Sequence, residues 1–260
     1  MIAILGSGIS GLFAAWACLL NGKKFVIYTN EGKKPYVMPC TYLHQDCGIP
    51  FIGKTILNQY CIPKKINDVD VSHNYIELGK MYSEKVYGDK NAKNNFAEKG
   101  SRTSHPIWNM QQAVDFLWNA TRDCMEHREI KGLEEIKAIS KDKDLVISTL
   151  PLNCIDLGSL IGRRSYQTRW VTEFQSESKE DYCIFNVSDN TDWYRMGNVF
   201  GRSFVESLER LEPDSYEVKK LDSIGDIPTI DNRIMFTGRY GCWNQKMLAH
   251  EVFYEVLKKI

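Results

Sequence analysis

The chain begins "MIAILGSGISGLFAAWACLLNGKKFVIYTNE" (residues 1–31), and this stretch decides the fold. Residues 2–5 are a short apolar run that ends at a glycine, a pattern typical of a buried parallel strand. Residues 10–21 have helical spacing of apolar side chains, and Asn-Gly ends the helix. Residues 25–28 predict a second strand. Strand, turn, helix and strand within about thirty residues predict a right-handed parallel crossover.

The turn between the first strand and the helix carries the pattern G-x-G-x-x-G. Gly6 permits a tight turn, Gly8 lets a pyrophosphate approach the backbone, and Gly11 lets the helix pack closely against the strand. The helix N-terminus offers unpaired N–H groups and a partial positive charge to phosphates. The sequence therefore predicts a dinucleotide site, with contacts expected from Gly6, Ser7, Gly8, Ile9, Ser10 and Gly11.

The second strand lacks the acidic residue that usually binds a ribose at its end. Thr29 stands in that place and offers one hydroxyl, while Asn30 or Glu31 can serve instead if the turn is shifted. This departure weakens the prediction of ribose binding and leaves that of pyrophosphate binding intact. The fingerprint by itself does not separate NAD from FAD.

The composition is that of an ordinary globular protein, with 43% hydrophobic and 25% charged residues. The 33 basic residues balance the 33 acidic ones, so no global field favours nucleic acid or a membrane surface. The eight cysteines form no C-x-x-C and predict free thiols in a reducing compartment. Cys40, His44, Cys47 and Cys61 match no usual zinc spacing, so no metal is expected.

The chain lacks an apolar run long enough for a membrane span. Its start has no basic region of the kind that begins a signal peptide. We therefore expect a cytoplasmic protein that acts on a small molecule, and nothing in the sequence points to nucleic acid. A homodimer remains open.

The rest of the chain predicts further elements. They are, in order, a stretch without clear period at 31–65, an exposed loop at 84–103, a helix at 109–126, a strand at 145–149, antiparallel strands within 166–206, a strand at 234–237, and a helix that reaches the C-terminus.

Two distant segments resemble parts of a known protein group. "KDLVISTLPL" (residues 143–152) resembles the stretch in two-domain flavoproteins where the chain leaves the FAD domain. "NRIMFTGRYGCWNQKMLAHEVFYEVL" (residues 232–257) resembles their last strand, Gly-Arg turn and final helix. The group includes amine oxidases, protoporphyrinogen-oxidase-like proteins and UDP-galactopyranose mutases, and this chain is similar to a small, divergent member.

The resemblance implies an α/β fold, in which a Rossmann-like FAD/NAD(P)-binding domain has a parallel sheet. A smaller α+β substrate domain with antiparallel strands is inserted into it. The expected FAD domain comprises residues 1–40, 106–150 and 226–260, and the expected substrate domain comprises residues 41–105 and 151–225. FAD is the favoured cofactor and NAD(P) the less favoured one.

The resemblance also implies that both segments lie near the cofactor. The residues that it brings to the cofactor are Thr149, Leu150, Pro151, Gly238, Arg239, Trp243, Asn244 and Met247. Arg239 is expected to neutralise the pyrophosphate or an anionic substrate. For Trp243 two interpretations stay open: it lines the flavin site, or it packs beneath the last helix.

Three residues are candidates for the chemistry. His44, in a loop after the second strand, can act as a base or hydrogen-bond donor, although a lone histidine also serves as a packing residue. Tyr194 and Arg195 lie together in "DNTDWYRMGN" (residues 189–198). Arg195 can hold a carboxylate or phosphate as a two-pronged donor, or can be a surface charge on a strand.

The leading hypothesis is an FAD-dependent oxidoreductase that oxidises an amine or similar polar small molecule by hydride transfer to the flavin. The substrate can be an amino-acid-derived group, free or on a larger carrier or nucleotide. One alternative is an isomerase or mutase that uses reduced flavin on a nucleotide sugar. The other is a non-catalytic FAD- or NAD-binding protein.

Overall fold

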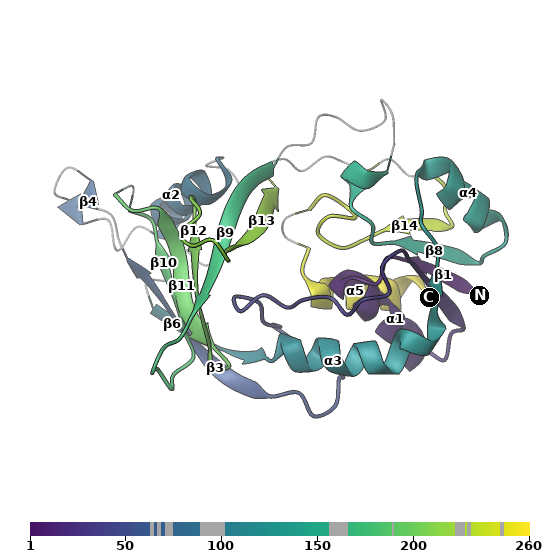
Figure 1. Cartoon of the computed structure of the whole chain (residues 1–260), viewed down its shortest axis with the longest axis horizontal. Helices are drawn as coiled ribbons and strands as arrows, with labels where there is room; N and C mark the ends of the chain where they lie inside the picture. Colours follow the sequence, from purple (N-terminus) through teal and green to yellow (C-terminus); the bar gives the residue numbers. More distant parts are fainter. Residues whose placement is uncertain are drawn as a thin grey trace.

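The computed structural model describes residues 1–62, 65–66, 69–70, 75–88, 102–155, 166–188, 190–221, 227, 230–244 and 247–260. These residues form two main sheets that lie at opposite ends of the molecule, with sheet A on the right and sheet B on the left of Figure 1. Helices cover both faces of sheet A, and a large cavity lies between the two ends.

Sheet A is parallel throughout and has the strand order β14-β8-β1-β2-β7. Its strands are β1 (Ile2–Leu5), β2 (Phe25–Thr29), β7 (Met125–His127), β8 (Leu145–Ser148) and β14 (Ile234–Phe236). The central strands β1 and β8 are buried at every residue. Their near-continuous apolar sequence follows from this position, because helices cover both faces of the sheet.

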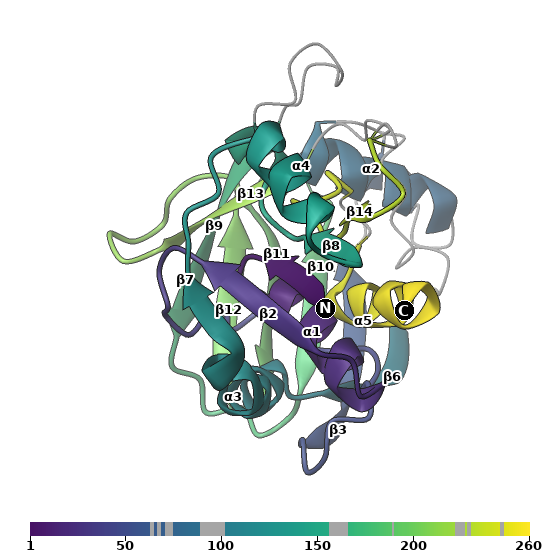
Figure 2. The same cartoon turned by 90° about the vertical axis from the view of Figure 1, so that its right-hand side faces the viewer.

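The helices around sheet A are α1 (Ile9–Leu20), α3 (Met110–Thr121), α4 (Leu133–Lys141) and α5 (Ala249–Lys259). Side chains of α1, α3 and α5 form one core with Ile4 on one face of the sheet. Side chains of α4 form a second core with Leu5 on the opposite face. Neighbouring side chains of β1 point to opposite faces of the sheet and therefore belong to two separate cores. Figure 2 shows α4 apart from α1 and α3.

Sheet B has the strand order β13-β9-β12-β11-β10-β3-β6. Its strands are β3 (Lys54–Ile62), β6 (Arg102–Trp108), β9 (Tyr166–Phe174), β10 (Tyr182–Asn186), β11 (Trp193–Val199), β12 (Arg202–Ser207) and β13 (Tyr216–Leu221). All neighbours are antiparallel except β10 and β3, which are parallel. Helix α2 (Tyr75–Tyr87) packs into the core of this sheet, and β4 (Lys65–Ile66) pairs with β5 (Val69–Asp70).

The predicted fold class is confirmed, because a parallel α/β sheet is combined with a second, mainly antiparallel sheet. The predicted strands at 2–5, 25–28, 145–149 and 234–237 and the first and last helices occur within one or two residues of their expected bounds. The strands of sheet A come from separated parts of the chain, as do those of sheet B.

Two predictions are wrong in part. The helix expected at 109–126 ends at Thr121, because the chain turns through a short 3₁₀ helix (Arg122–Cys124) into β7, which extends the sheet beside β2. The loop expected at 84–103 is helical up to Tyr87 and already in β6 from Arg102. Residues 89–101 lie outside the described part.

Strand β3, helix α4 and strand β13 are among the elements that were not predicted from the sequence. Strand β3 reads "KTILNQYCI", with apolar and polar residues mixed on both of its faces, so its alternation is hidden. Helix α4 is short and β13 is an edge strand rich in charge. The two strands are stabilised by their neighbours in the sheet rather than by a strong local pattern. Helix α4 does have a local pattern, because Leu133, Ile136 and Ile139 recur every three residues and are buried.

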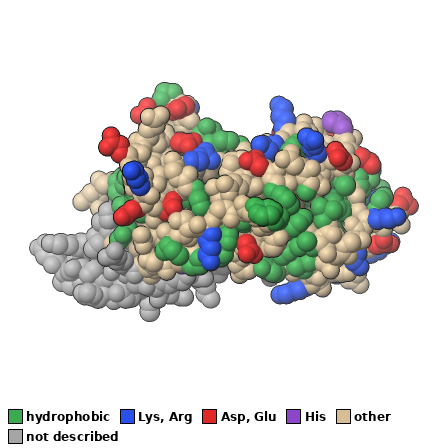
Figure 3. Space-filling view, turned by 90° about the horizontal axis from the view of Figure 1, so that it is seen from below, with side chains coloured by type: hydrophobic (Ala, Val, Ile, Leu, Met, Phe, Trp, Pro, Cys, Tyr) green, Lys and Arg blue, Asp and Glu red, His purple; other side chains and the backbone are tan. Residues whose placement is uncertain are grey.

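The surface carries no large single-sign charge on the side seen in Figure 3, where charged side chains of both signs surround a group of hydrophobic ones. In the described part of the chain, no helix is both long enough and apolar enough to pass through a membrane. All eight cysteines belong to this part, and none of them forms a disulfide.

Candidate cofactor and substrate site

The glycines of the first turn have different structural roles. Gly6 has φ of +98°, a conformation that favours glycine. A Cβ atom on Gly11 would lie 1.9 Å from the carbonyl oxygen of Gly6, so helix and strand could not pack as they do. A Cβ atom on Gly8 would meet nothing within 4 Å. Gly6 and Gly11 therefore build the turn, whereas Gly8 leaves space open in front of it.

The start of α1 is prepared to receive an anion. Gly8 is its N-cap, no side chain caps it, and no acidic residue lies in the first turn. The first intrahelical bond runs from the amide of Leu12 to the carbonyl of Gly8 (3.0 Å), so the amides before Leu12 have no intrahelical acceptor. Gly8, Ile9 and Ser10 all line the cavity. Free amides and the helix dipole point to phosphate binding there.

Three distant segments converge around this helix start. The amide and hydroxyl of Thr149 both donate to the carbonyl of Leu5, at 3.0 and 2.9 Å. Gly238 has φ of +84°, and a Cβ atom there would lie 2.6 Å from the Ser10 hydroxyl. The turns after β8 and β14 therefore pack against the glycine turn.

At the end of β2, Thr29 stands where an acidic residue usually binds the ribose, and its hydroxyl is bonded within the protein. The hydroxyl groups of Ser7 and Thr29 form a buried hydrogen bond of 2.7 Å, and the amide of Gly32 donates to Thr29 at 3.5 Å. The Thr29 hydroxyl is thus committed to the turn. Asn30 and Glu31, which follow it, are exposed and line the cavity.

A segment that the sequence analysis missed lines the same end of the cavity. Residues 128–131 follow β7, which lies beside β2. The Arg128 guanidinium lies 5.1 Å from the centre of the Tyr28 ring and forms an ion pair with Glu135 (3.1 Å). The only signal in the sequence was β7 itself, and its first two residues, Met125 and Glu126, were assigned to the preceding helix.

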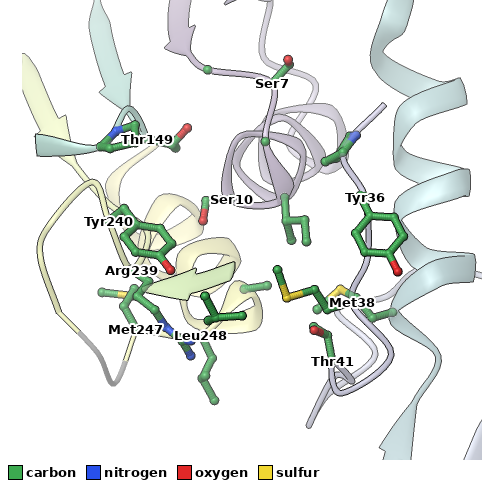
Figure 4. Close-up of a pocket in the computed structure, with 18 of the residues that line it drawn as sticks. Ser7, Ser10, Tyr36, Met38, Thr41, Thr149, Arg239, Tyr240, Met247 and Leu248 are labelled. Atoms are coloured by element: carbon green, nitrogen blue, oxygen red, sulfur yellow. The ribbon is translucent and has the colours of Figure 1, made fainter. Parts of the chain in front are cut away.

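The cavity has a volume of about 1690 Å³ and extends from the glycine turn to the inner face of sheet B. This exceeds the range of about 300–1,000 Å³ that is usual for small-molecule sites, so a dinucleotide and a second molecule can share it. Figure 4 shows Ser10 facing the opening, with Tyr240 and Tyr36 on opposite sides of it and Met38 between them.

Most of the residues predicted from the sequence meet in this cavity. Those in its lining are Gly6, Ser7, Gly8, Ile9, Ser10, Thr29, Asn30, Glu31, His44, Thr149, Leu150, Pro151, Arg195, Arg239 and Met247. Those outside the lining are Gly11, Tyr194, Gly238, Trp243 and Asn244.

The residues outside the lining have packing roles close by. Trp243 is 2% exposed and belongs to the core on the α4 side of sheet A. Neither interpretation of this residue holds as stated: Trp243 does not line the cavity, and it packs on the α4 side of sheet A rather than beneath the last helix, α5. Tyr194 is fully buried and donates its hydroxyl to Glu206 at 3.4 Å. The backbone amide of Asn244 donates to Arg239 (2.9 Å) and closes the turn.

His44 is part of a cluster of rings rather than a lone histidine. Its ring stacks on His105 of β6 at 5.6 Å and lies 5.8 Å from His250 of α5. The Tyr42 ring lies 5.2 Å from His44, and all four side chains line the cavity. Burial lowers the pKa of His250, while nearby Glu251 opposes this shift. His105 and His250 gave no signal because only the fold brings them to His44.

Sheet B contributes a buried group of charges to the opposite wall. Glu206 of β12 forms ion pairs with Arg195 of β11 and with Lys220 of β13. Burial alone would raise the pKa of the Glu206 carboxyl, but the attraction of Arg195 and Lys220 holds it below its ordinary value. The carboxylate is therefore ionised between two cations, and all three side chains line the cavity. Among the described residues, no group of three histidine, cysteine or acidic side chains could hold a metal ion.

Solved structures share the fold described above. No protein-family model and no curated protein matches the chain. A reduced UDP-galactopyranose mutase superposes with a TM-score of 0.62 at 10% identity, over 99% of this chain and 94% of that one. The tryptophan 5-halogenase MibH gives 0.56 at 11% identity, over 98% and 65%.

A triple mutant of the flavin-dependent brominase Bmp2 gives a TM-score of 0.54 at 9% identity, over 99% of this chain and 79% of that one. At such low identity the similarity concerns the fold and not the reaction. The chain nevertheless aligns along nearly its whole length with each of these proteins. It has the fold of the FAD-dependent flavoproteins that residues 143–152 and 232–257 resemble.

Proposed function

We propose that the protein is an FAD-dependent enzyme that binds FAD along the sheet A end of the cavity. The observation that carries this proposal is the difference among the glycines. Protein atoms lie directly against Gly6 and Gly11, so a side chain at either position would clash. The space in front of Gly8 is open, and it lies beside the uncapped amides of the helix. A diphosphate fits such a cradle, because backbone amides and the helix dipole stabilise its charge.

The neighbouring residues suit the two ends of the cofactor. Asn30, Glu31 and Arg128 would lie at the adenosine end, and Arg239 and Met247 at the flavin end. In this proposal residues 1–40, 106–150 and 226–260 form the FAD domain, and residues 41–105 and 151–225 form the substrate domain. When bound, FAD supplies a hydride acceptor that no side chain can supply.

We further propose that the reaction is the oxidation of an amine or similar polar small molecule. The cavity has room for a second molecule. His44, with His105 and His250 beside it, can take or hold a proton of the substrate, because an uncharged imidazole is a base near neutral pH. Arg195 can bind and orient the substrate from sheet B.

A second candidate function is the isomerisation of a nucleotide sugar with reduced flavin. The superposition on a reduced UDP-galactopyranose mutase over nearly both whole chains supports it. The two candidates differ in electron balance. An oxidase reduces its flavin with the substrate alone, whereas a mutase needs prior reduction, for example by dithionite, and then has no net turnover of oxidant.

The visible spectrum of the purified protein tests the cofactor. We expect flavin bands that are lost on substitution Gly8→Ala, with binding of added FAD weakened about tenfold or more. Gly132→Ala is a matched control, since Gly132 is also an uncapped helix N-cap at which a Cβ atom would meet nothing within 4 Å, and it lies outside the cavity lining. A colourless protein that does not take up FAD would exclude the proposal.

The reaction is tested by anaerobic mixing with amines, amino acids and alcohols. Bleaching of the flavin by one of them supports the oxidoreductase. Conversion of a nucleotide sugar after dithionite reduction, without bleaching by any amine, supports the mutase. A bound flavin that responds to neither set indicates a non-catalytic binding protein.

A further inference from the structure

Three charged side chains of sheet B meet at the cavity wall, and their charges do not sum to zero. The Glu206 side chain is 1% exposed, and those of its partners Arg195 and Lys220 are 16% and 13% exposed. One carboxylate thus faces two cations, and the buried group carries a net positive charge. Burying an uncompensated charge is unfavourable, so binding of a further anion would stabilise this group.

No other acidic side chain compensates this charge within the described part of the cavity wall. Its other carboxylates are those of Glu31 and Glu129, which follow β2 and β7, and of Glu251 in α5. The Glu251 carboxylate accepts from the amide of Leu248 at the start of that helix. The acidic contribution of sheet B to the cavity is therefore Glu206 alone.

Both cations keep donors that the described residues do not use. The Lys220 ammonium has three N–H groups, and its hydrogen bond within this part of the chain is the one to Glu206 (3.1 Å). The Arg195 guanidinium donates from Nε to Glu206 and from Nη2 to the Cys40 carbonyl (3.3 Å). These bonds fix the direction of the guanidinium and leave Nη1 without an acceptor among the described residues.

Aromatic and apolar side chains surround this charged group. Tyr82 and Phe185 line the cavity and contact each other edge to face, with ring centres 5.4 Å apart. Tyr42 and Val218 line the same cavity. A molecule bound here would therefore meet two cationic donors at one point and apolar surface around it.

We propose that Arg195 and Lys220, both held by Glu206, bind an anionic oxyacid group of the substrate, a carboxylate or a phosphate, and that an apolar or aromatic part of the same molecule packs against Tyr82 and Phe185. This inference rests on the proposed function in that the bound molecule is taken to be the substrate of the flavin reaction. It gives the substrate class: an organic anion.

The test is isothermal titration of the purified full-length protein with benzoate, phenyl phosphate and the neutral isostere benzamide. We expect at least one of the two anions to bind, and benzamide to bind about tenfold more weakly or worse. The tighter of the two anions identifies the oxyacid group. Equal binding of benzamide and the anions, or binding of none of the three, overturns the proposal.

Two variants assign the binding to the charged group. Lys220→Met leaves a neutral Arg195–Glu206 pair and should weaken anion binding about tenfold or more. Lys219→Met is the matched control, because the Lys219 ammonium lies over the Tyr166 ring at 4.7 Å and does not line the cavity. Equal effects of the two substitutions would contradict the assignment.

Glu206→Gln separates binding from a merely structural role. It leaves two cations without their carboxylate, so its folded fraction should bind the anion more tightly than the wild type. If the variant does not fold, the two lysine variants still decide. The titration needs no flavin. A protein that takes up no FAD but shows Lys220-dependent anion binding refutes the FAD proposal alone. A protein that binds FAD but none of the anions refutes this inference alone.

Discussion

The two ends of the cavity are built in different ways. At sheet A the charge-stabilising groups are backbone amides at the start of α1, set by glycines within residues 6–11. At sheet B they are the side chains of Arg195, Glu206 and Lys220, from three strands of the same sheet. The amide cradle of the first end depends on local geometry and carries no formal charge of its own. The second depends on tertiary pairing and buries three charges, so the two ends should respond differently to substitution.

The largest effect is expected at the buried charges. Glu206→Gln removes the carboxylate that two cations share, and should lower the free energy of unfolding by about 3–5 kcal/mol. Denaturant unfolding measures this. Glu173→Gln is the matched control on the same sheet, because the Glu173–Arg202 pair is more exposed and should be worth about 1 kcal/mol or less. Equal losses would show that burial does not distinguish the two carboxylates.

The next effect concerns the glycine turn. Gly11→Ala places a methyl group against the Gly6 carbonyl, and should cost about 3 kcal/mol of stability. Gly8→Ala meets no protein atom and should change stability by less than about 0.5 kcal/mol while weakening FAD binding. Thermal unfolding of both variants without cofactor checks this. A large destabilisation by Gly8→Ala would mean that its open space is not reserved for a ligand.

A fall in pH should reduce the stabilisation that the ionised Glu206 contributes at the sheet B end. The folded pKa of Glu206 lies below its unfolded value of about 4.3, so its stabilisation is present above that pH. It is lost as the pH falls through the lower, folded pKa, because the unfolded chain then binds more protons. We expect the stability gap between wild type and Glu206→Gln to narrow below about pH 4. Urea unfolding at a series of pH values measures the gap, and a constant gap would contradict the lowered pKa.

The smallest effect is expected at the end of β2. Ser7→Ala removes the hydroxyl that is bonded to Thr29 at 2.7 Å and should cost about 1 kcal/mol. Thr29→Val should cost a similar amount, and the double variant less than the sum of both, because the two hydroxyls share one bond. Additive losses in a double-mutant cycle would show that the pair is not coupled.

The sequence alone was a reliable guide to the elements with strong local patterns. The strand, glycine turn and helix of residues 2–20 were predictable because a buried strand, a tight turn and a packed helix each restrict the residue types nearby. Strand β7 was not, because it has three residues and depends on its pairing with β2, which comes from elsewhere in the chain. Strand β3 was hidden by polar residues such as Gln59 on its inner face.

The same division holds for the site. The sequence by itself determined the amide cradle at Gly8, since backbone groups a few residues apart are positioned by local conformation. Only the tertiary structure decided that His44 joins His105 and His250, and that Arg195 shares Glu206 with Lys220. Side chains far apart in the chain interact only once sheets and helices bring them together. A local sequence pattern contains no information about which distant residues will meet.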